Sequence, residues 1–86
     1  MRYVVLLENQ AEKELRSLPE GVLKRVDIKL QALSLDPRPR GAAKLKGKEG
    51  EGWRLRIGDY RILYQIDDKE NAIRIYRIKH RREIYR

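Results

Sequence analysis

The sequence contains no cysteine, and it has no hydrophobic run long enough to cross a membrane. The missing cysteine excludes disulfide bonds, thiolate catalysis and cysteine-ligated zinc sites. The apolar stretch near the N-terminus ends at Glu8, which makes it too short for a signal peptide or a membrane span. The acidic residues and the single histidine form no cluster with metal-ligand spacing. We therefore expect a cytoplasmic protein with no membrane association and with neither a metal nor another cofactor.

The chain has 86 residues, of which 41% are hydrophobic. This length allows one domain with a modest core, so we predict a single domain over residues 1–86. The 21 lysines and arginines exceed the 13 acidic residues and give a net charge of +8. Residues 43–86 contribute +6 of this charge, and residues 1–42 contribute +2. Such an asymmetry is hard to ascribe to a well-solvated surface alone, and it predicts a polyanionic partner, either nucleic acid or an acidic protein.

The N-terminal half predicts one strand and two helices. Residues 2–8 predict a buried strand, and residues 9–17 a short helix with Asn9 as N-cap and Glu12 completing a capping box. A second helix over residues 19–36 begins at a proline and ends before one, because the residue preceding proline resists the α conformation. The apolar positions that recur at helical spacing in this second helix are Val22, Leu23, Val26, Leu30 and Leu33.

In the C-terminal half the hydrophobic period becomes that of strands. We predict strands over residues 53–57, 60–66 and 72–78, with Gly58-Asp59 and residues 67–71 as turns. The order of elements predicts an α+β fold of β-α-α-β-β-β topology. Two N-terminal helices would pack on one face of a mostly antiparallel four-stranded sheet.

The two-residue turn at Gly58-Asp59 fixes the register of the hairpin around it. On one face, which we expect to be the core, counting pairs Ile57 with Tyr60, Leu55 with Ile62, and Trp53 with Tyr64. On the other face, Arg56 lies opposite Arg61, and Arg54 lies opposite Leu63. Opposed arginines repel each other at a cost of roughly some tenths of a kcal/mol. The pair indicates either a site for an anion such as phosphate, which guanidinium groups bind through two hydrogen bonds, or side chains that splay apart into water.

Two further basic clusters flank this hairpin. Residues 77–86 are strongly basic and contain the only histidine, His80, while Ile84 and Tyr85 are apolar anchors that a frayed tail would not need. The other cluster precedes the hairpin in a predicted loop, where lysines are most often simply solvated. It consists of Lys44, Lys46 and Lys48.

Three segments together resemble the RelE/ParE superfamily of bacterial and archaeal toxins. They are LKG at residues 45–47, WRLRIGDYRILY at residues 53–64, and HRREIYR at residues 80–86. The resemblance implies a RelE-like fold over the whole chain and a RelE-type mRNA interferase of a type II toxin–antitoxin system. Such toxins enter the ribosomal A site, cleave mRNA there and inhibit translation, and a co-expressed antitoxin holds them inactive.

The resemblance also implies a catalytic site. Arg56, Arg61 and Arg81 are implied to be catalytic, together with Tyr85 and with His80, which resembles the general acid of some branches. Further basic positions are expected to bind RNA or the ribosome; they are Lys44, Lys46, Arg54, Lys79, Arg82 and Arg86. The sequence departs from the family before the LKG segment, where some branches carry a carboxylate base and this chain has Gly41-Ala42-Ala43.

Metal-free RNA cleavage uses the ribose 2′-hydroxyl as nucleophile and needs a base, an acid and charge stabilisation. Arginines stabilise the dianionic transition state but are poor proton carriers, because the pKa of a guanidinium is so high. Tyr85 would accept the 2′-hydroxyl proton if nearby cations favour its ionised form. His80 would protonate the leaving oxygen, because an imidazole titrates near neutrality, although a lone surface histidine more often has no such role. Orientation of the mRNA by the ribosome would supply much of the rate, so we expect little cleavage of free RNA.

Three other functions remain open from the sequence. A ParE-like protein of the same fold would inhibit DNA gyrase, and the combination of Arg61, Arg81 and Tyr85 argues against it. A non-catalytic nucleic-acid-binding module would need stacking aromatics on the basic face, whereas Trp53, Tyr60 and Tyr64 are predicted to point into the core. An orphan toxin without activity is the third. Any antitoxin should be acidic and partly helical where it covers this chain, and a toxin–antitoxin complex could bind operator DNA mainly through the antitoxin.

Overall fold

The computed structural model describes residues 2–84, with the backbone alone at Glu49, Glu83 and Ile84. In chain order the elements are β1 (Val4–Leu7), α1 (Asn9–Arg16), α2 (Glu20–Leu35), β2 (Ala43–Lys44), the 3-10 helix η1 (Gly47–Glu49), β3 (Trp53–Ile57), β4 (Tyr60–Asp67), β5 (Ala72–His80) and α3 (Arg81–Ile84). The strands form one sheet in the order β1-β5-β4-β3-β2. Among the described residues, no helix is both long and apolar enough to cross a membrane.

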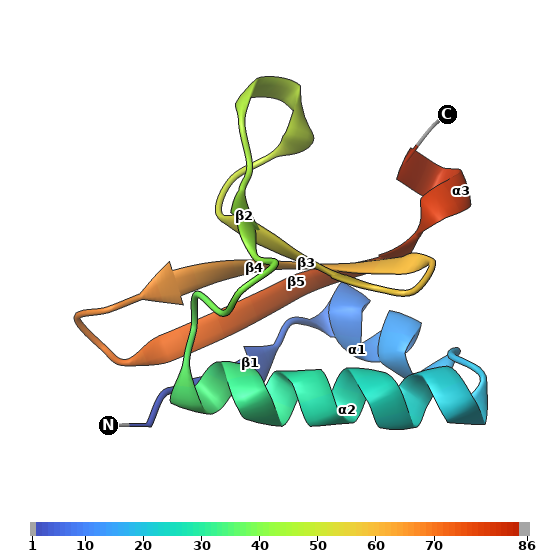
Figure 1. Cartoon of the computed structure of the whole chain (residues 1–86), viewed down its shortest axis with the longest axis horizontal. Coiled ribbons are helices and arrows are strands. Elements are labelled where there is room, and N and C mark those ends of the chain that lie inside the picture. The colour runs from blue at the N-terminus through green and yellow to red at the C-terminus, as the bar shows by residue number, and fades with distance from the viewer. Residues whose placement is uncertain (1, 85–86) are drawn as a thin grey trace.

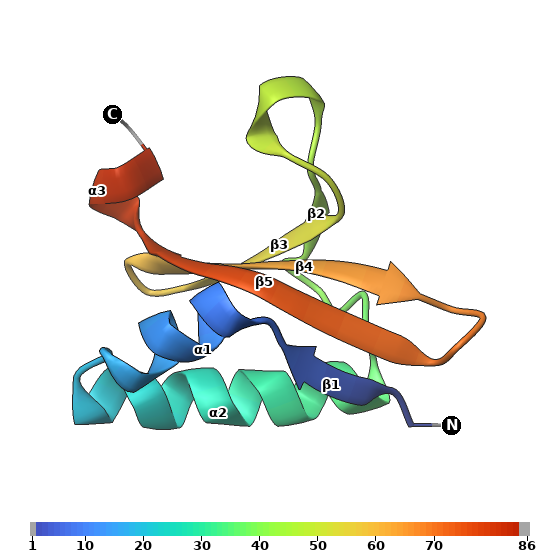
Figure 2. The ribbon, with the colours of Figure 1, turned by 180° about the vertical axis from the view of Figure 1, so that it is seen from behind.

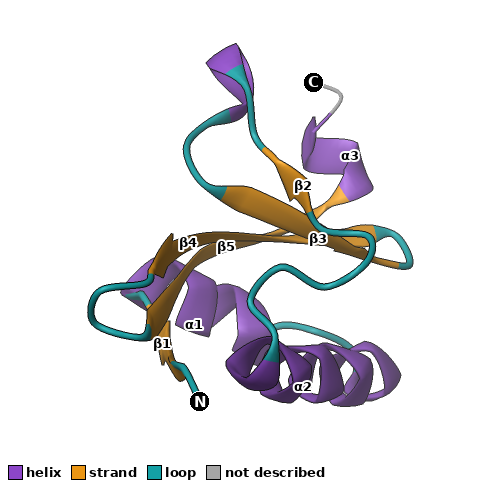
Figure 3. Cartoon of the chain, turned by 60° about the vertical axis from the view of Figure 1, so that its left-hand side comes forward, coloured by secondary structure: helices purple, strands orange, loops and turns teal. Residues whose placement is uncertain are grey.

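Two layers make up the molecule. Figures 1 and 2 show α1 and α2 on one face of the sheet, here called the helix face. The segment that carries η1, and α3 at the other end of the chain, both project from the opposite face, here called the outer face (Figure 3). The predicted α+β class and the helical pair on one face of the sheet are thus confirmed.

The sheet has five strands where four were predicted. The additional strand, β2, pairs antiparallel with the start of β3, so that Ala43 lies opposite Arg54 and Lys44 opposite Trp53. Two residues are too few to show a strand period, which is why the sequence indicated only a loop here. The remaining strand pairs are antiparallel except for β1, which runs parallel to β5.

The core lies between the helices and the helix face. Its largest fully buried side chains come from α2 and from the two strands β4 and β5, and they are Val26, Leu33, Ile62, Tyr64, Ile73 and Ile75. The predicted apolar positions Val26, Leu30 and Leu33 are buried, and Val22 packs against them. The hydroxyl of Tyr64 donates a hydrogen bond to the carbonyl of Pro37 at 2.9 Å, and burial raises the pKa of Tyr64 to about 12.

The predicted capping box of the first helix is wrong. Glu8 is the N-cap, no side chain caps this end, and Asn9 is the first helical residue. The reason is that the Glu8 N–H donates to the carbonyl of Ile75 at 2.9 Å, which extends the pairing of β1 with β5 by one residue. The second helix begins after Pro19 and ends before an extended Asp36, as the proline positions predicted.

The hairpin of β3 and β4 has the predicted register throughout. Gly58 supplies the positive φ, +56°, that a primed turn needs at its first position. Between β4 and β5 a bulge leaves Tyr76 with no residue of β4 directly opposite it, since Leu63 pairs with Arg77 and Tyr64 with Ile75. The bulge shifts the phase of β5, which explains why Ile75 and Ile78, three residues apart, are both buried.

Candidate nucleic-acid interface

The outer face carries a row of basic residues that crosses three strands. Arg56 on β3 lies opposite Arg61 on β4, which in turn lies opposite Lys79 on β5. Each is next to a buried residue of the helix face along its strand, so its own side chain points to the outer face. Arg54, two residues before Arg56 on β3, lies opposite Leu63 on the same face.

A pocket of about 130 Å³ opens at the hairpin end of this row. Its basic lining consists of Arg56, Arg61 and Arg81, and the Gly58-Asp59 turn and Tyr60 complete it. The structure therefore brings three of the five predicted catalytic residues together, from β3, β4 and the start of α3. Because guanidinium groups bind negative oxygens through paired hydrogen bonds, this pocket is the candidate anion site of the outer face.

Asp59 holds Arg81 at this pocket, and sequence reasoning did not single it out. The backbone N–H of Arg81 donates to the Asp59 carbonyl at 2.7 Å. The Arg81 guanidinium also lies 3.6 Å from the Asp59 carboxylate, with both side chains more than 60% exposed. Because an ion pair so exposed is weak, a phosphate could displace Asp59 from Arg81 at little cost.

His80 lies on the other side of the sheet from the arginine row. It is the cross-strand partner of Tyr60, and the two rings meet edge to face with their centroids 4.9 Å apart. With residues of α1 they line a separate groove of about 300 Å³. The structure thus does not bring His80 together with Arg56, Arg61 and Arg81. The signal was present in the sequence, because His80 follows the core residue Ile78 by two positions.

The other predicted binding residues occupy several places. Lys46 is exposed on the η1 segment and Arg82 on α3, while Lys44 shares the side of Trp53 rather than that of Arg54. Arg54 and Lys79 are half-buried on the outer face. Tyr85 and Arg86 lie outside the described residues.

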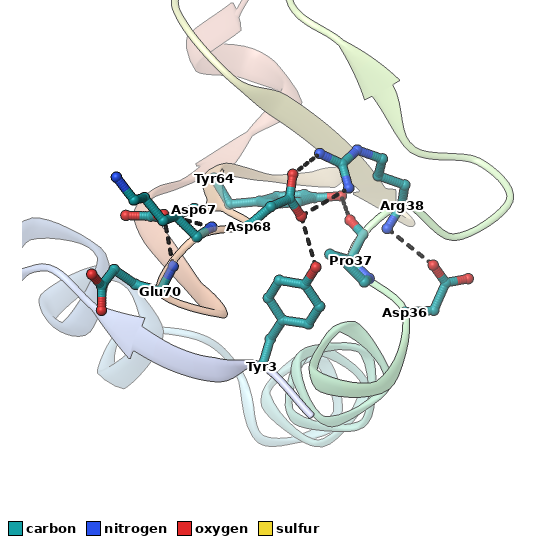
Figure 4. A network of polar contacts seen from close by, with 9 residues as sticks. Tyr3, Asp36, Pro37, Arg38, Tyr64, Asp67, Asp68 and Glu70 are labelled. Carbon is teal, nitrogen blue, oxygen red and sulfur yellow. Dashed lines mark hydrogen bonds and ion pairs between the residues drawn. The ribbon is translucent and has the colours of Figure 1, made fainter. Parts of the chain in front are cut away.

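A polar network at the far end of the sheet fixes the loop that leads into β2 (Figure 4). The Arg38 guanidinium donates two hydrogen bonds to the Asp68 carboxylate, at 2.8 and 3.3 Å, and stacks 5.3 Å from the centroid of Trp53. The Tyr3 hydroxyl donates to the same carboxylate at 2.7 Å. The hydrogen bonds from Arg38 and Tyr3 lower the pKa of Asp68. In the sequence Arg38 was only a loop residue, because Trp53 and Asp68 lie 15 and 30 residues further along the chain.

Glu14 of α1 joins this helix to β5. Its carboxylate accepts hydrogen bonds from the Arg77 guanidinium at 2.8 to 3.1 Å and from the Ile78 N–H at 2.8 Å. Burial alone would raise the pKa of Glu14, but the hydrogen bonds from Arg77 and Ile78 outweigh it and lower the pKa.

Known proteins share both the sequence and this architecture. The family described as ParE toxin of type II toxin–antitoxin systems matches residues 5–85. Toxin RelG of Mycobacterium tuberculosis is 34% identical over 87 residues, covering 100% of this chain and 99% of the relative. A chain of the RelBE2 toxin–antitoxin complex of M. tuberculosis superposes with a TM-score of 0.82 at 31% identity, over 93% of this chain and 92% of that one. A chain of the archaeal RelE–RelB complex from Pyrococcus horikoshii superposes with a TM-score of 0.82 at 34% identity, over 94% of this chain and 97% of that one.

Proposed function

Because this chain belongs to the RelE/ParE superfamily and is a toxin of a RelBE-type toxin–antitoxin system, we propose that it cleaves mRNA in the ribosomal A site. The observation that carries the proposal is the convergence of Arg56, Arg61 and Arg81 on one pocket. A surface used only for non-specific binding of nucleic acid would need a basic face, but it would not need three guanidinium groups around one small cavity.

The proposed reaction is attack of a ribose 2′-hydroxyl on the adjacent phosphate, which forms a 2′,3′-cyclic phosphate and breaks the bond to the 5′-oxygen of the next nucleotide. That oxygen takes a proton from water as it leaves. In the transition state the phosphate carries two negative charges, and hydrogen bonds from the three arginines would stabilise that charge more than the single charge of the substrate. Tyr85 is the proposed base for the 2′-hydroxyl proton. Arginines cannot exchange protons near neutral pH, so they contribute through charge alone.

The proposed partners are the ribosome with its mRNA, and an antitoxin. The solved structures of related toxins include complexes of RelE with RelB, which supports an antitoxin for this chain. We expect the antitoxin to be acidic where it meets the outer face, since it must neutralise the row formed by Arg56, Arg61 and Lys79. An amphipathic helix would suit the apolar parts of the contact.

Growth arrest combined with mapping of mRNA 5′ ends tests the proposal. Induction of the parent should arrest growth and produce cuts at codon-phased positions, and both effects should be lost in Arg61→Ala and in Tyr85→Ala. Arg16→Ala is the matched control, because Arg16 lies on α1, is 76% exposed and pairs with its helical neighbour Glu12. Cuts without codon phase would remove the ribosome from the proposal, and cuts that survive Arg61→Ala would move the site elsewhere.

A ParE-like inhibitor of DNA gyrase is the second candidate, because the family that matches the chain is described as ParE. The same experiment separates the two functions. Arrest with intact mRNA would exclude the nuclease, and accumulation of broken DNA under those conditions would favour the gyrase inhibitor.

A further inference from the structure

The first two backbone N–H groups of α3 both have hydrogen-bond acceptors. The N–H of Arg81 donates to the carbonyl of Asp59 at 2.7 Å, and the N–H of Arg82 donates to Nδ1 of His80 at 3.2 Å. A side chain that accepts from the second residue of a helix is an N-cap, so His80 caps α3. Capping is important here, because α3 spans only Arg81–Ile84 and so short a helix has little stability of its own.

The position of the His80 ring suits this role better than proton transfer in the arginine pocket. The ring packs against Tyr60 on the helix face, in the groove lined by Lys13 and Glu14 of α1. The arginine pocket is lined by Arg56, Arg61 and Arg81 on the outer face, and His80 is not among its residues.

We propose that His80 is a positioning residue, whose neutral ring caps α3 and thereby holds Arg81 at the arginine pocket, and that it does not donate the proton to the leaving oxygen. This inference rests on the proposed function, since Arg81 acts there on the scissile phosphate. The Asp59 carbonyl fixes the same turn of the chain from the other side of Arg81.

The two roles of His80 predict opposite pH dependence. A general acid must be protonated, so its activity is lost as the pH rises through the titration of the imidazole. A cap must accept at Nδ1, and protonation turns Nδ1 into a donor that faces the Arg82 N–H, so activity is lost as the pH falls. The charged and titratable groups that face the ring are Lys13 and Glu14 from α1 and Tyr60 from β4. Glu14 stays ionised at and somewhat below neutral pH because its pKa is lowered.

The decisive variants are His80→Asn and His80→Ala. Asparagine is a good N-cap that cannot act as an acid, whereas alanine removes the cap. In single-turnover cleavage on programmed ribosomes we expect His80→Ala to lose roughly tenfold in rate, and His80→Asn to stay within about threefold of the parent. Toward acid the parent should slow more steeply than His80→Asn, because both keep Tyr85 as the proposed base but only the parent can lose the cap by protonation. Equal loss in both variants, or a parent that slows toward alkaline pH, would overturn the inference.

A second measurement needs no catalysis. Trypsin cuts after Arg81 and Arg82, so its rate at these bonds, mapped by mass spectrometry on the purified full-length chain, reports fraying of α3. We expect faster cutting there in His80→Ala than in His80→Asn or the parent, with similar thermal unfolding midpoints. If the parent cleaves no mRNA, the proposed function is rejected, and the trypsin assay alone tests whether His80 caps α3. If trypsin cleaves His80→Ala at these bonds no faster than the parent, the cap itself is rejected.

Discussion

Gly52 occupies a position where the packing leaves no room for a side chain. Its φ is +95°, a backbone conformation that other residues rarely adopt. A Cβ at this position would lie 2.2 Å from the backbone oxygen of Tyr64, and that oxygen belongs to the strand that pairs with β3. Neither backbone can move without breaking the first pair of the hairpin.

Gly52→Ala should therefore destabilise the protein by at least about 3 kcal/mol, through left-handed strain and the backbone clash together. Gly21→Ala is the matched control, because Gly21 lies in α2 and a Cβ there would contact nothing within 4 Å. That change should stabilise the protein by about 0.5–1 kcal/mol, since alanine is the better helix former. Urea unfolding measures the stability of both variants. A loss of unfolding free energy below about 1 kcal/mol in Gly52→Ala would show that the hairpin backbone shifts to accommodate the new Cβ.

Arg56 and Arg61 show what alternation can predict for single residues. Their facing positions follow from the two-residue turn and from the apolar residues on the other side, all of which lie close along the chain. Asp59 was within the same motif and was still missed, because its partner Arg81 reaches it only after β4 and β5 have turned back. The close approach at Gly52 was missed for a related reason, since the sequence does not show which carbonyl a glycine faces.

On the side that faces β1, the end of β5 needs a hydrogen-bond acceptor that β1 does not supply. β1 pairs with β5 only over Ala72 to Ile75, so the N–H of Ile78 has no strand partner on that side. The carboxylate of Glu14 takes that place at 2.8 Å and also binds the Arg77 guanidinium. A charged side chain thus closes an edge that could otherwise pair with another chain.

Glu14→Ala should destabilise the protein by about 2–3 kcal/mol, because it leaves a half-buried guanidinium and a backbone donor without this acceptor. The contribution also depends on pH. Since folding lowers the pKa of Glu14, its stabilisation is complete above the unfolded pKa of about 4.3 and is lost as the pH falls through the lower folded value. Chemical unfolding between pH 7 and 2 should therefore give curves for the parent and Glu14→Ala that converge in acid.

Glu12→Ala is the control for this comparison. Glu12 lies on the same helix and pairs with Arg16, but both side chains are exposed, so the change should cost less than about 0.5 kcal/mol. Equal losses in Glu12→Ala and Glu14→Ala would mean that removing any carboxylate from this helix, and not the contact at the edge of β5, explains the effect.

The sequence predicts those helices and strands whose signals lie in residues close together along the chain. Both long helices and the hairpin register follow from period, prolines and turn length. The two-residue strand β2 and the bulge at Tyr76 do not, because each exists only through its pairing partner. The N-cap of α1 is Glu8 and not the predicted Asn9 for the same reason, since it depends on the hydrogen bond from the Glu8 N–H to Ile75 on β5.

The two ends of β4 differ in the charged residues that gather there. The arginine pocket lies at the start of this strand, whereas Asp67 and Asp68 lie at its end, about 25 Å away for eight extended residues. Asp67 accepts hydrogen bonds from the Lys69 and Glu70 N–H groups, and Asp68 binds Arg38, so these acids stabilise their own loops. The overall charge of +8 predicted an anionic partner, and the arrangement along β4 indicates which end should meet it.

A polyanion that binds at the pocket end should release counterions from the groups that contact it. For single-stranded RNA the slope of log K against log salt is about −0.7 per neutralised phosphate. Replacing both Arg56 and Arg61 by alanine should therefore make the slope shallower by about 1.4. The matched control replaces Arg16 and Lys24, which are 76% and 75% exposed and lie in helical ion pairs on α1 and α2. Fluorescence anisotropy with a short RNA over a KCl series measures both. If the control lost as much slope as the pocket variant, the RNA would be responding to net charge, and the outer face would have no special part in binding.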